Sequence, residues 1–177
     1  MMKKILAVLF AGLLVLALAA CGGKKQEEDP QPSSSVGMAN PWSDVSTASE
    51  AAEGAGVGYF TVPDSGAKVG TVTVNWSVFR WMTGLAEARG TVGNAELTIR
   101  KGLKENGTDV SGDYNTYEKE WTVDVGGVTV NCFGDKNGMM FKALWTTDNF
   151  SYSIFLHGDG ADGLGADDTI ALVSAVE

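Results

Sequence analysis

The stretch that decides the fold is residues 117–157, YEKEWTVDVGGVTVNCFGDKNGMMFKALWTTDNFSYSIFLH. It contains four runs rich in β-branched and aromatic residues, separated by turn signals at Gly126-Gly127, at residues 135–138 and at residues 147–149. Such short gaps join antiparallel neighbours, and a Gly-Gly pair suits a two-residue hairpin turn. The pattern therefore predicts four consecutive strands in a meander.

Further strands are predicted before the meander. Apolar and polar residues alternate over residues 71–81 and again over residues 95–100. A period of two is typical of an antiparallel strand with one buried face. Residues 57–62 predict another strand, which a Pro-Asp-Ser-Gly turn at residues 63–66 ends.

Two short helices complete the predicted domain. Thr47 and Glu50 have the spacing of a capping box and predict a helix over residues 48–55. A closing helix is expected near the end of the chain, with Asp167 or Asp168 as its N-cap. The fold class predicted for residues 40–177 is α+β: a single domain with a curved antiparallel β-meander of six to seven strands, a short N-terminal helix and a C-terminal helix.

The first twenty residues have the pattern of a signal peptide. Lys3 and Lys4 precede an apolar run that ends in small residues. The string Leu-Ala-Ala-Cys-Gly at residues 18–22 resembles the lipobox of bacterial lipoproteins, in which the cysteine thiol is acylated and becomes the first residue of the mature chain. This resemblance implies lipidation at Cys21. The alternative is an uncleaved N-terminal anchor, although the apolar run is short for a membrane span.

A tether is predicted between the lipid and the domain. Residues 21–39 begin with the lipidated Cys21 and continue with Gly, Lys, Gln, Glu, Pro and Ser. So few apolar side chains cannot offset the ordering entropy, and the segment is expected to be disordered. The predicted location is the extracytoplasmic face of the cell membrane, with acyl chains as the contact with the bilayer. Inner and outer membrane both stay open for a host with two membranes.

Charge and residue counts argue against several functions. The formal net charge is −9, and such an acidic chain is not expected to bind nucleic acid. Once Cys21 carries lipid, Cys132 is the only other cysteine and is interpreted as a small buried hydrophobic residue. His157 is the single histidine, so zinc sites built from several Cys and His residues are not expected.

One acidic loop is a candidate calcium site. Asp159, Asp162, Asp167 and Asp168 lie among glycines, and Ca²⁺ prefers several oxygen ligands on a flexible loop. The spacing is not that of an EF-hand, and a solvated turn that leads into the closing helix explains the same residues. No other cofactor is expected.

Trp81 is the candidate for an exposed binding aromatic. It lies five positions after Trp76, and residues an odd number apart face opposite sides of an unbroken strand. One of the two is then expected in the core, and the other on the surface or under a helix. An exposed aromatic side chain could stack on a sugar or a peptide.

The opening of the domain resembles a known family. Asn40-Pro41-Trp42, the run Thr-Ala-Ser-Glu-Ala-Ala at residues 47–52, Ala55-Gly56 and Phe-Thr-Val-Pro at residues 60–63 follow one another. This order is similar to that of a lipoprotein ectodomain family of Gram-positive, clostridial-type bacteria, whose biochemical role is unassigned. The resemblance implies a meander, a short closing helix and an envelope location, and it implies no catalytic residue.

These observations favour a non-enzymatic module of the cell envelope that binds a ligand or a partner. The partner class stays open among an envelope protein, a peptide and a glycan. The alternative is a hydrolase of cell-wall or extracellular glycans that works through two carboxylates. A hydrolase predicts a cleft with carboxylates of raised pKa, whereas a binding module predicts an aromatic or apolar surface.

Overall fold

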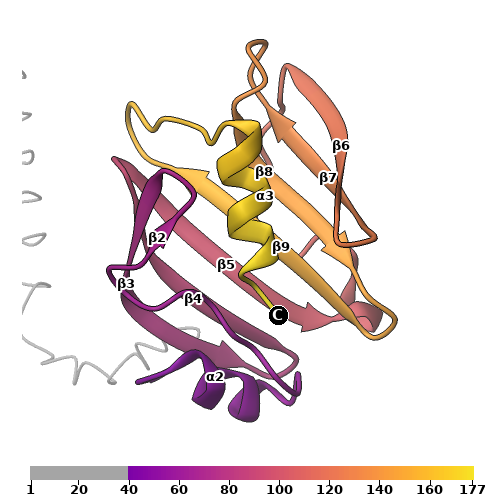
Figure 1. Cartoon of the computed structure of the whole chain (residues 1–177). Helices are drawn as coiled ribbons and strands as arrows, with labels where there is room; N and C mark the ends of the chain where they lie inside the picture. Colours follow the sequence, from indigo (N-terminus) through magenta and orange to yellow (C-terminus); the bar gives the residue numbers. More distant parts are fainter. Residues whose placement is uncertain (1–39) are drawn as a thin grey trace, which may run out of the picture. The chain divides into compact units, whose positions relative to one another are not determined.

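The computed structural model of the protein describes residues 40–177 (Figure 1). The predicted signal peptide, the lipidation at Cys21 and the tether of residues 21–39 lie outside the described residues. Within the described part, no helix is both long and apolar enough to cross a bilayer.

Nine strands and two α-helices make up the described domain. Their bounds are β1 Ser43–Val45, α2 Ala48–Ala55, β2 Lys68–Val69, β3 Val72–Met82, β4 Leu85–Val92, β5 Ala95–Leu103, the short 3-10 helix η1 Lys104–Asn106, β6 Lys119–Val125, β7 Val128–Gly134, β8 Met140–Thr146, β9 Phe150–His157 and α3 Ala166–Ser174.

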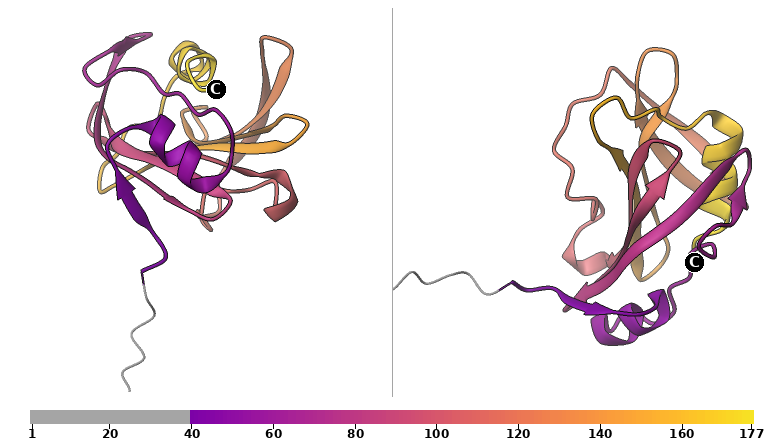
Figure 2. Two further views of the ribbon diagram at one scale, coloured as in Figure 1. Left: turned by 90° about the horizontal axis from the view of Figure 1, so that it is seen from below. Right: turned by 90° about the vertical axis from the view of Figure 1, so that its left-hand side faces the viewer.

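All strand pairs are antiparallel, and the sheet order is β1-β3-β4-β5-β9-β8-β7-β6, with β2 paired to the start of β3. The sheet therefore consists of two meanders, β3–β5 and β6–β9, which meet where β5 pairs with β9. Figure 2 shows that the sheet curls around α3, which lies along its inner face. The long connection from β5 to β6 runs from the middle of the sheet to its edge strand, and this connection forms one wall of the candidate site described below.

The predicted fold class is confirmed, although the sheet has nine strands instead of six or seven. β4 was not predicted as a strand because its sequence, LAEARGTV, carries Ala, Glu and Arg, which are weak strand formers. The predicted strand over residues 57–62 is wrong: the segment is extended but lies outside the sheet. Its Val57 and Phe60 are nevertheless fully buried, which explains the apolar pattern.

A β-bulge in β3 changes which tryptophans share a face. The register with β4 shifts between Trp76 and Val78, so Trp76 pairs with Gly90 whereas Val78 pairs with Arg89. The extra residue brings Trp76 and Trp81 to the same inner face, where both are partly buried against the core. The expectation that they face opposite sides is wrong because it assumed an unbroken strand.

The inner face of the sheet holds the hydrophobic core, to which α2 and α3 contribute. The predicted cap of α2 is confirmed, since the Glu50 N–H donates to Thr47 Oγ1 at 3.1 Å. Gly54 of α2 lies against the Trp81 indole so closely that a side chain there would overlap the ring. Trp81 is therefore half-buried beneath a helix.

The predicted cap of α3 is wrong. The N-cap is Gly165, which has no side chain to accept a hydrogen bond, and Asp167 and Asp168 lie in the first helical turn. Asp168 reaches sideways instead: its two carboxylate oxygens accept hydrogen bonds from the Thr71 N–H at 2.7 Å and the Thr71 hydroxyl at 2.8 Å. This contact ties α3 to the turn between β2 and β3.

Candidate functional site: a cavity on the outer face of the sheet

A row of charged side chains crosses the outer face, the side of the sheet opposite α2 and α3. Arg80 of β3, Glu87 of β4 and Arg100 of β5 are direct cross-strand neighbours. Glu87 is fully buried, and its two oxygens accept from Arg80 Nε at 2.5 Å and from Arg100 Nε at 2.6 Å. Two arginines thus compensate one buried carboxylate, as a buried charge requires.

Trp42 lies over both arginines of this row. The Arg80 guanidinium carbon lies 4.3 Å from the centre of the Trp42 ring, and that of Arg100 lies at 5.6 Å. A guanidinium over an indole face gains a cation–π attraction. The N-terminal segment, in which the sequence suggested only a family signature, thereby helps to hold the two arginines in place.

Residues 107–118, which connect η1 to β6, pack onto the outer face without regular secondary structure. Arg100 Nη1 donates to the carbonyl oxygens of Val110 at 3.2 Å and Ser111 at 2.7 Å. The Ser151 hydroxyl donates to the Gly107 carbonyl at 2.7 Å. Side chains of the sheet therefore hold this connection by its backbone carbonyls. We call residues 107–118 the outer loop.

A buried lysine fixes the second half of the outer loop. Lys142 Nζ of β8 lies 3.4 Å from Asp109 Oδ2 and 3.3 Å from Asp113 Oδ2. The Tyr117 hydroxyl donates to the same Asp113 oxygen at 2.8 Å. Lys142 and Asp113 are both buried, so the loop carboxylates are neutralised by the sheet.

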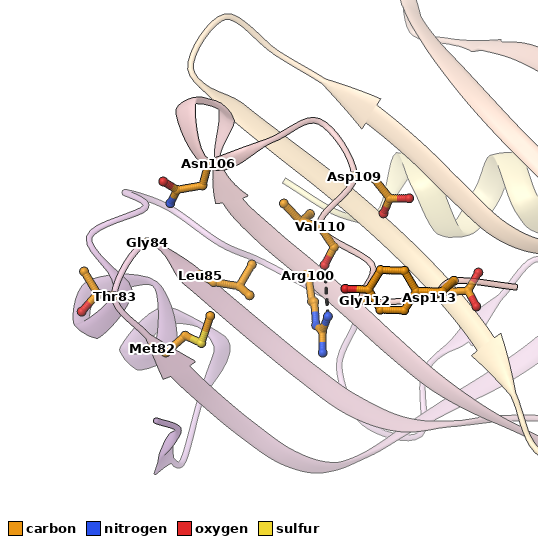
Figure 3. A pocket seen from close by; sticks show the side chains of 11 residues that line it. Met82, Thr83, Gly84, Leu85, Arg100, Asn106, Asp109, Val110, Gly112 and Asp113 are labelled. Atoms are coloured by element: carbon orange, nitrogen blue, oxygen red, sulfur yellow. Dashed lines mark hydrogen bonds between the residues drawn. The ribbon is translucent and has the colours of Figure 1, made fainter. Parts of the chain in front are cut away.

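The loop and the β3–β4 turn enclose a cavity of about 570 Å³ (Figure 3). Residues 82–85 form one wall, Arg100 lies between the walls, and the opposite wall is formed by Asn106 and residues 109–114. Figure 3 shows Met82 and Leu85 facing the loop residue Val110. The lining therefore combines apolar side chains with a few polar groups, as in small-ligand sites.

The charged groups of the cavity are already engaged, whereas its uncharged polar groups are not. Arg100 and Asp113 have the partners given above, and Asp109 also accepts from the Ser111 hydroxyl at 2.6 Å. Within the described residues, the side chains of Thr83, Asn106 and Tyr114 form no hydrogen bond. All three are exposed, and Tyr114 keeps 97% of its surface accessible to solvent.

The electrostatics of Asp109 favour its charged form. Burial alone would raise its pKa, but the hydrogen bonds from the Ser111 hydroxyl and N–H and the nearby Lys142 ammonium outweigh burial and hold the pKa below its usual value. A general acid needs the opposite shift. Tyr117 has a raised pKa, first because it is partly buried and second because it donates to Asp113.

The four aspartates predicted to bind calcium do not converge. Asp168 is bound to Thr71, and Asp159, Asp162 and Asp167 lie in exposed positions before or at the start of α3. Among residues 40–177, no three His, Cys, Asp or Glu side chains gather in a way that could hold a metal ion.

The other residues considered from sequence lie apart from the cavity. Cys132 is fully buried, as predicted, and burial raises the pKa of its thiol to about 11. His157 ends β9, stacks on Phe155 with ring centres 5.0 Å apart and lies 3.5 Å from a Glu96 oxygen.

Sequence reasoning missed the outer loop, although its pattern was visible. Asp109, Ser111, Asp113 and Asn115 place oxygen-bearing side chains at alternate positions, a spacing that calcium loops also use. In the structure the side chains of Asp109, Ser111 and Asp113 each accept from the N–H two positions on, as in the 3.0 Å bond from the Asn115 N–H to Asp113. The Lys142 ammonium lies where the two carboxylates approach each other.

Comparison with known proteins found no match to a family model, to a curated protein or to a solved structure.

Proposed function

We propose that the chain is a lipid-anchored protein of the cell envelope whose folded domain binds an uncharged, hydroxyl-rich ligand, such as a sugar unit of a glycan, in the outer-face cavity. The observation that carries this proposal is that, in the described part of the chain, the charged groups of the cavity wall are paired within the protein and the uncharged polar groups are not. Charged groups are paired with the protein, whereas the hydroxyl of Thr83, the amide of Asn106 and the ring and hydroxyl of Tyr114 are free to meet a ligand.

This difference in pairing favours neutral ligands over ions. An anion would have to compete with Glu87 and two backbone carbonyls for Arg100. A cation would have to compete with Lys142 for Asp109 and Asp113. A sugar unit can instead exchange hydroxyl hydrogen bonds with Thr83 and Asn106 and place its apolar face on Tyr114, Met82 or Leu85.

The alternative is a carboxylate-dependent glycan hydrolase that uses Asp109 and Asp113 in the same cavity. Two nearby carboxylates favour this reading. The lowered pKa of Asp109 and the lysine between the two acids argue against a proton donor there. Incubation with the oligosaccharides that bind, followed by product analysis, separates the two: the binding module leaves them intact.

The binding proposal is tested with a panel of neutral and charged oligosaccharides measured by calorimetry on the purified chain. We expect binding only of neutral members, and about fivefold weaker binding after Tyr114→Ala, because one stacking contact contributes about 1 kcal/mol. Tyr59→Ala is the matched control, since Tyr59 is also exposed but lies outside the cavity. Equal effects of the two substitutions, or no binding by any member, would contradict the proposal.

The anchor is tested separately. Cys21→Ser is expected to release the protein from the membrane fraction and to abolish metabolic labelling with palmitate, because the thiol is the proposed acylation site. Intact-mass analysis of the unsubstituted protein should show loss of residues 1–20 and addition of acyl chains. An unmodified N-terminal methionine would contradict the anchor and leave the cavity proposal untouched.

A further inference from the structure

The two margins of the sheet differ in how they are covered. At the β3 margin, β1 pairs with one end of the strand and β2 with the other. At the opposite margin, β6 pairs only with β7 over its seven residues. An uncovered edge strand is a template for strand addition, and natural proteins usually blunt such edges with charged side chains, proline, bulges or a covering segment. The charged side chains of β6 are Lys119, Glu120 and Asp124, which disfavour pairing with segments of unmatched charge. β6 has neither a proline nor a bulge.

The hairpin register fixes which backbone groups of β6 point outward. Val125 pairs with Val128 across the two-residue turn Gly126-Gly127, so this closing pair is hydrogen-bonded, and the pairing alternates from there. The N–H and C=O groups of Glu120, Thr122 and Asp124 therefore point away from β7. No backbone hydrogen bond within the described residues uses these outward groups.

The side chains of β6 give the two faces of this edge opposite character. Glu120, Thr122 and Asp124 are exposed on the outer face. Trp121 and Val123 are half-buried on the inner face, beside the closing helix α3 (Figure 1). A strand added here would meet two carboxylates on one face. On the other face it would meet an apolar row that begins beside the exposed Lys119, whose ammonium lies 5.5 Å from the centre of the Trp121 ring.

We infer that the β6 edge binds an extended, cationic segment of another protein by strand addition, independently of the outer-face cavity. The segment alternates, with Lys or Arg opposite Glu120 and Asp124 and apolar residues opposite Trp121 and Val123. Main-chain hydrogen bonds supply the affinity and the side-chain alternation supplies the specificity.

Charge argues for a different protein over a second copy of this chain. A second copy brings the same formal charge of −9. In an antiparallel pairing of two β6 strands centred on Thr122, which uses all seven residues, Glu120 of one copy faces Asp124 of the other. Like charges directly opposite one another destabilise a strand pair.

The test uses the full chain in detergent and the capped peptide Val-Lys-Val-Thr-Val-Lys-Val. We expect saturable binding, with slowed hydrogen exchange at the amides of Glu120, Thr122 and Asp124. The same peptide with Glu in place of both Lys should bind about fivefold or more weakly, because two cross-strand charge pairs are lost and repulsions replace them. A peptide N-methylated on its strand-pairing amides should not bind.

Two variants of the chain make the test specific. Thr122→Pro removes an outward N–H without removing a hydrogen bond to β7, so it should abolish peptide binding while leaving the thermal unfolding transition cooperative. Glu120→Lys combined with Asp124→Lys should reverse the preference toward the Glu peptide. Binding that survives Thr122→Pro, unchanged exchange at these amides, or a dimer of the chain that Thr122→Pro dissociates would overturn the inference.

Discussion

At the scale of the residue, the outer face depends on one buried carboxylate. Glu87 has no exposed surface, and it accepts charge-assisted hydrogen bonds from Arg80 and Arg100. Arg80 in turn packs against the Trp42 ring, and Arg100 donates to the backbone of the outer loop. A single side chain thereby connects the N-terminal segment, three strands and the wall of the cavity.

Replacing Glu87 should therefore be costly. Glu87→Gln leaves Arg80, Arg100 and the more distant Arg89 beside a neutral amide. We expect a loss of about 3 kcal/mol in the free energy of unfolding, measured by urea titration. Glu96→Gln is the control, because Glu96 is exposed and lies 3.8 Å from Arg89; we expect it to cost less than about 0.5 kcal/mol. Similar losses in the two variants would show that Glu87 is not the centre of the network.

A second buried charge predicts a pH dependence. The ammonium of Lys101 donates to the Tyr59 carbonyl and lies 4.5 Å from the centre of the Phe150 ring. Burial lowers its pKa below 10.5, and the nearby Glu177 only partly opposes this shift. The unfolded chain therefore holds the lysine proton more tightly than the folded chain does. The resulting penalty on the folded state disappears as pH rises toward about 10.5.

This effect is isolated by comparison with Lys101→Met. As pH is raised from 7 toward 10.5, the free energy of unfolding of the wild type should increase relative to that of the variant. The comparison removes the opposite contribution of Cys132 and of Tyr152, whose raised pKa values destabilise the folded state at alkaline pH in both proteins. A difference that is constant with pH would refute the assignment.

At the scale of the element, local pattern and tertiary contact determined different parts of the structure. The meander β6–β9 and the cap of α2 could be predicted because their signals are local: alternation, turn residues and a capping box. β4 could not, because its Ala, Glu and Arg residues are acceptable in a strand only when the neighbouring strands supply partners for Glu87. The bulge in β3 carries no sequence signal that we can identify.

The candidate site was predicted even less completely. The sequence pattern favours the acidic residues before α3 as candidate ligands, whereas the structure brings the outer loop, Arg100 and Lys142 together. Lys142 belongs to β8 and Asp109 to a connection more than thirty residues earlier, as the separation of 33 positions shows. A pairing over that distance is decided by sheet order, which the local alternation of apolar residues does not reveal.

The contact between α2 and β3 reverses an ordinary rule. Gly→Ala in a helix normally gains about 1 kcal/mol of stability. Gly54→Ala should instead lose about 2 kcal/mol, because its Cβ would overlap the Trp81 ring. Adding Trp81→Leu should recover part of this loss, so a double-mutant cycle on thermal unfolding should give a favourable coupling. Stabilisation by Gly54→Ala alone would show that the ring moves aside freely.

At the scale of the whole domain, α3 and the residues after it hold two segments from the first half of the domain, around Thr61 and Thr71. Asp168 fastens the first turn of α3 to Thr71. After the helix, the Thr61 N–H donates to the Glu177 carbonyl at 2.9 Å, and the Glu177 N–H donates to the Thr61 carbonyl at 3.3 Å. The irregular segment that sequence analysis took for a strand is thus held by the C-terminal residues.

This arrangement predicts unequal roles for two neighbouring acids. Asp168→Ala should lower the free energy of unfolding by about 1 kcal/mol and speed hydrogen exchange in α3, because two hydrogen bonds to a charged group are lost. Asp167→Ala removes an acid from the same helical turn, but Asp167 is exposed, so its effect should be limited to a few tenths of a kcal/mol. Equal effects would mean that Asp168 acts only through the helix dipole.

The central claim is that the outer-face cavity is the place where this domain meets its ligand. Its most direct test is hydrogen-exchange mass spectrometry of the full chain, with and without the neutral oligosaccharide that binds most tightly in the calorimetric panel. We expect slower exchange only in the segments that contain the cavity lining, which are residues 82–85, Asn106, Asp109, Val110 and residues 112–114. Protection on another surface, or none at saturating oligosaccharide, would contradict it.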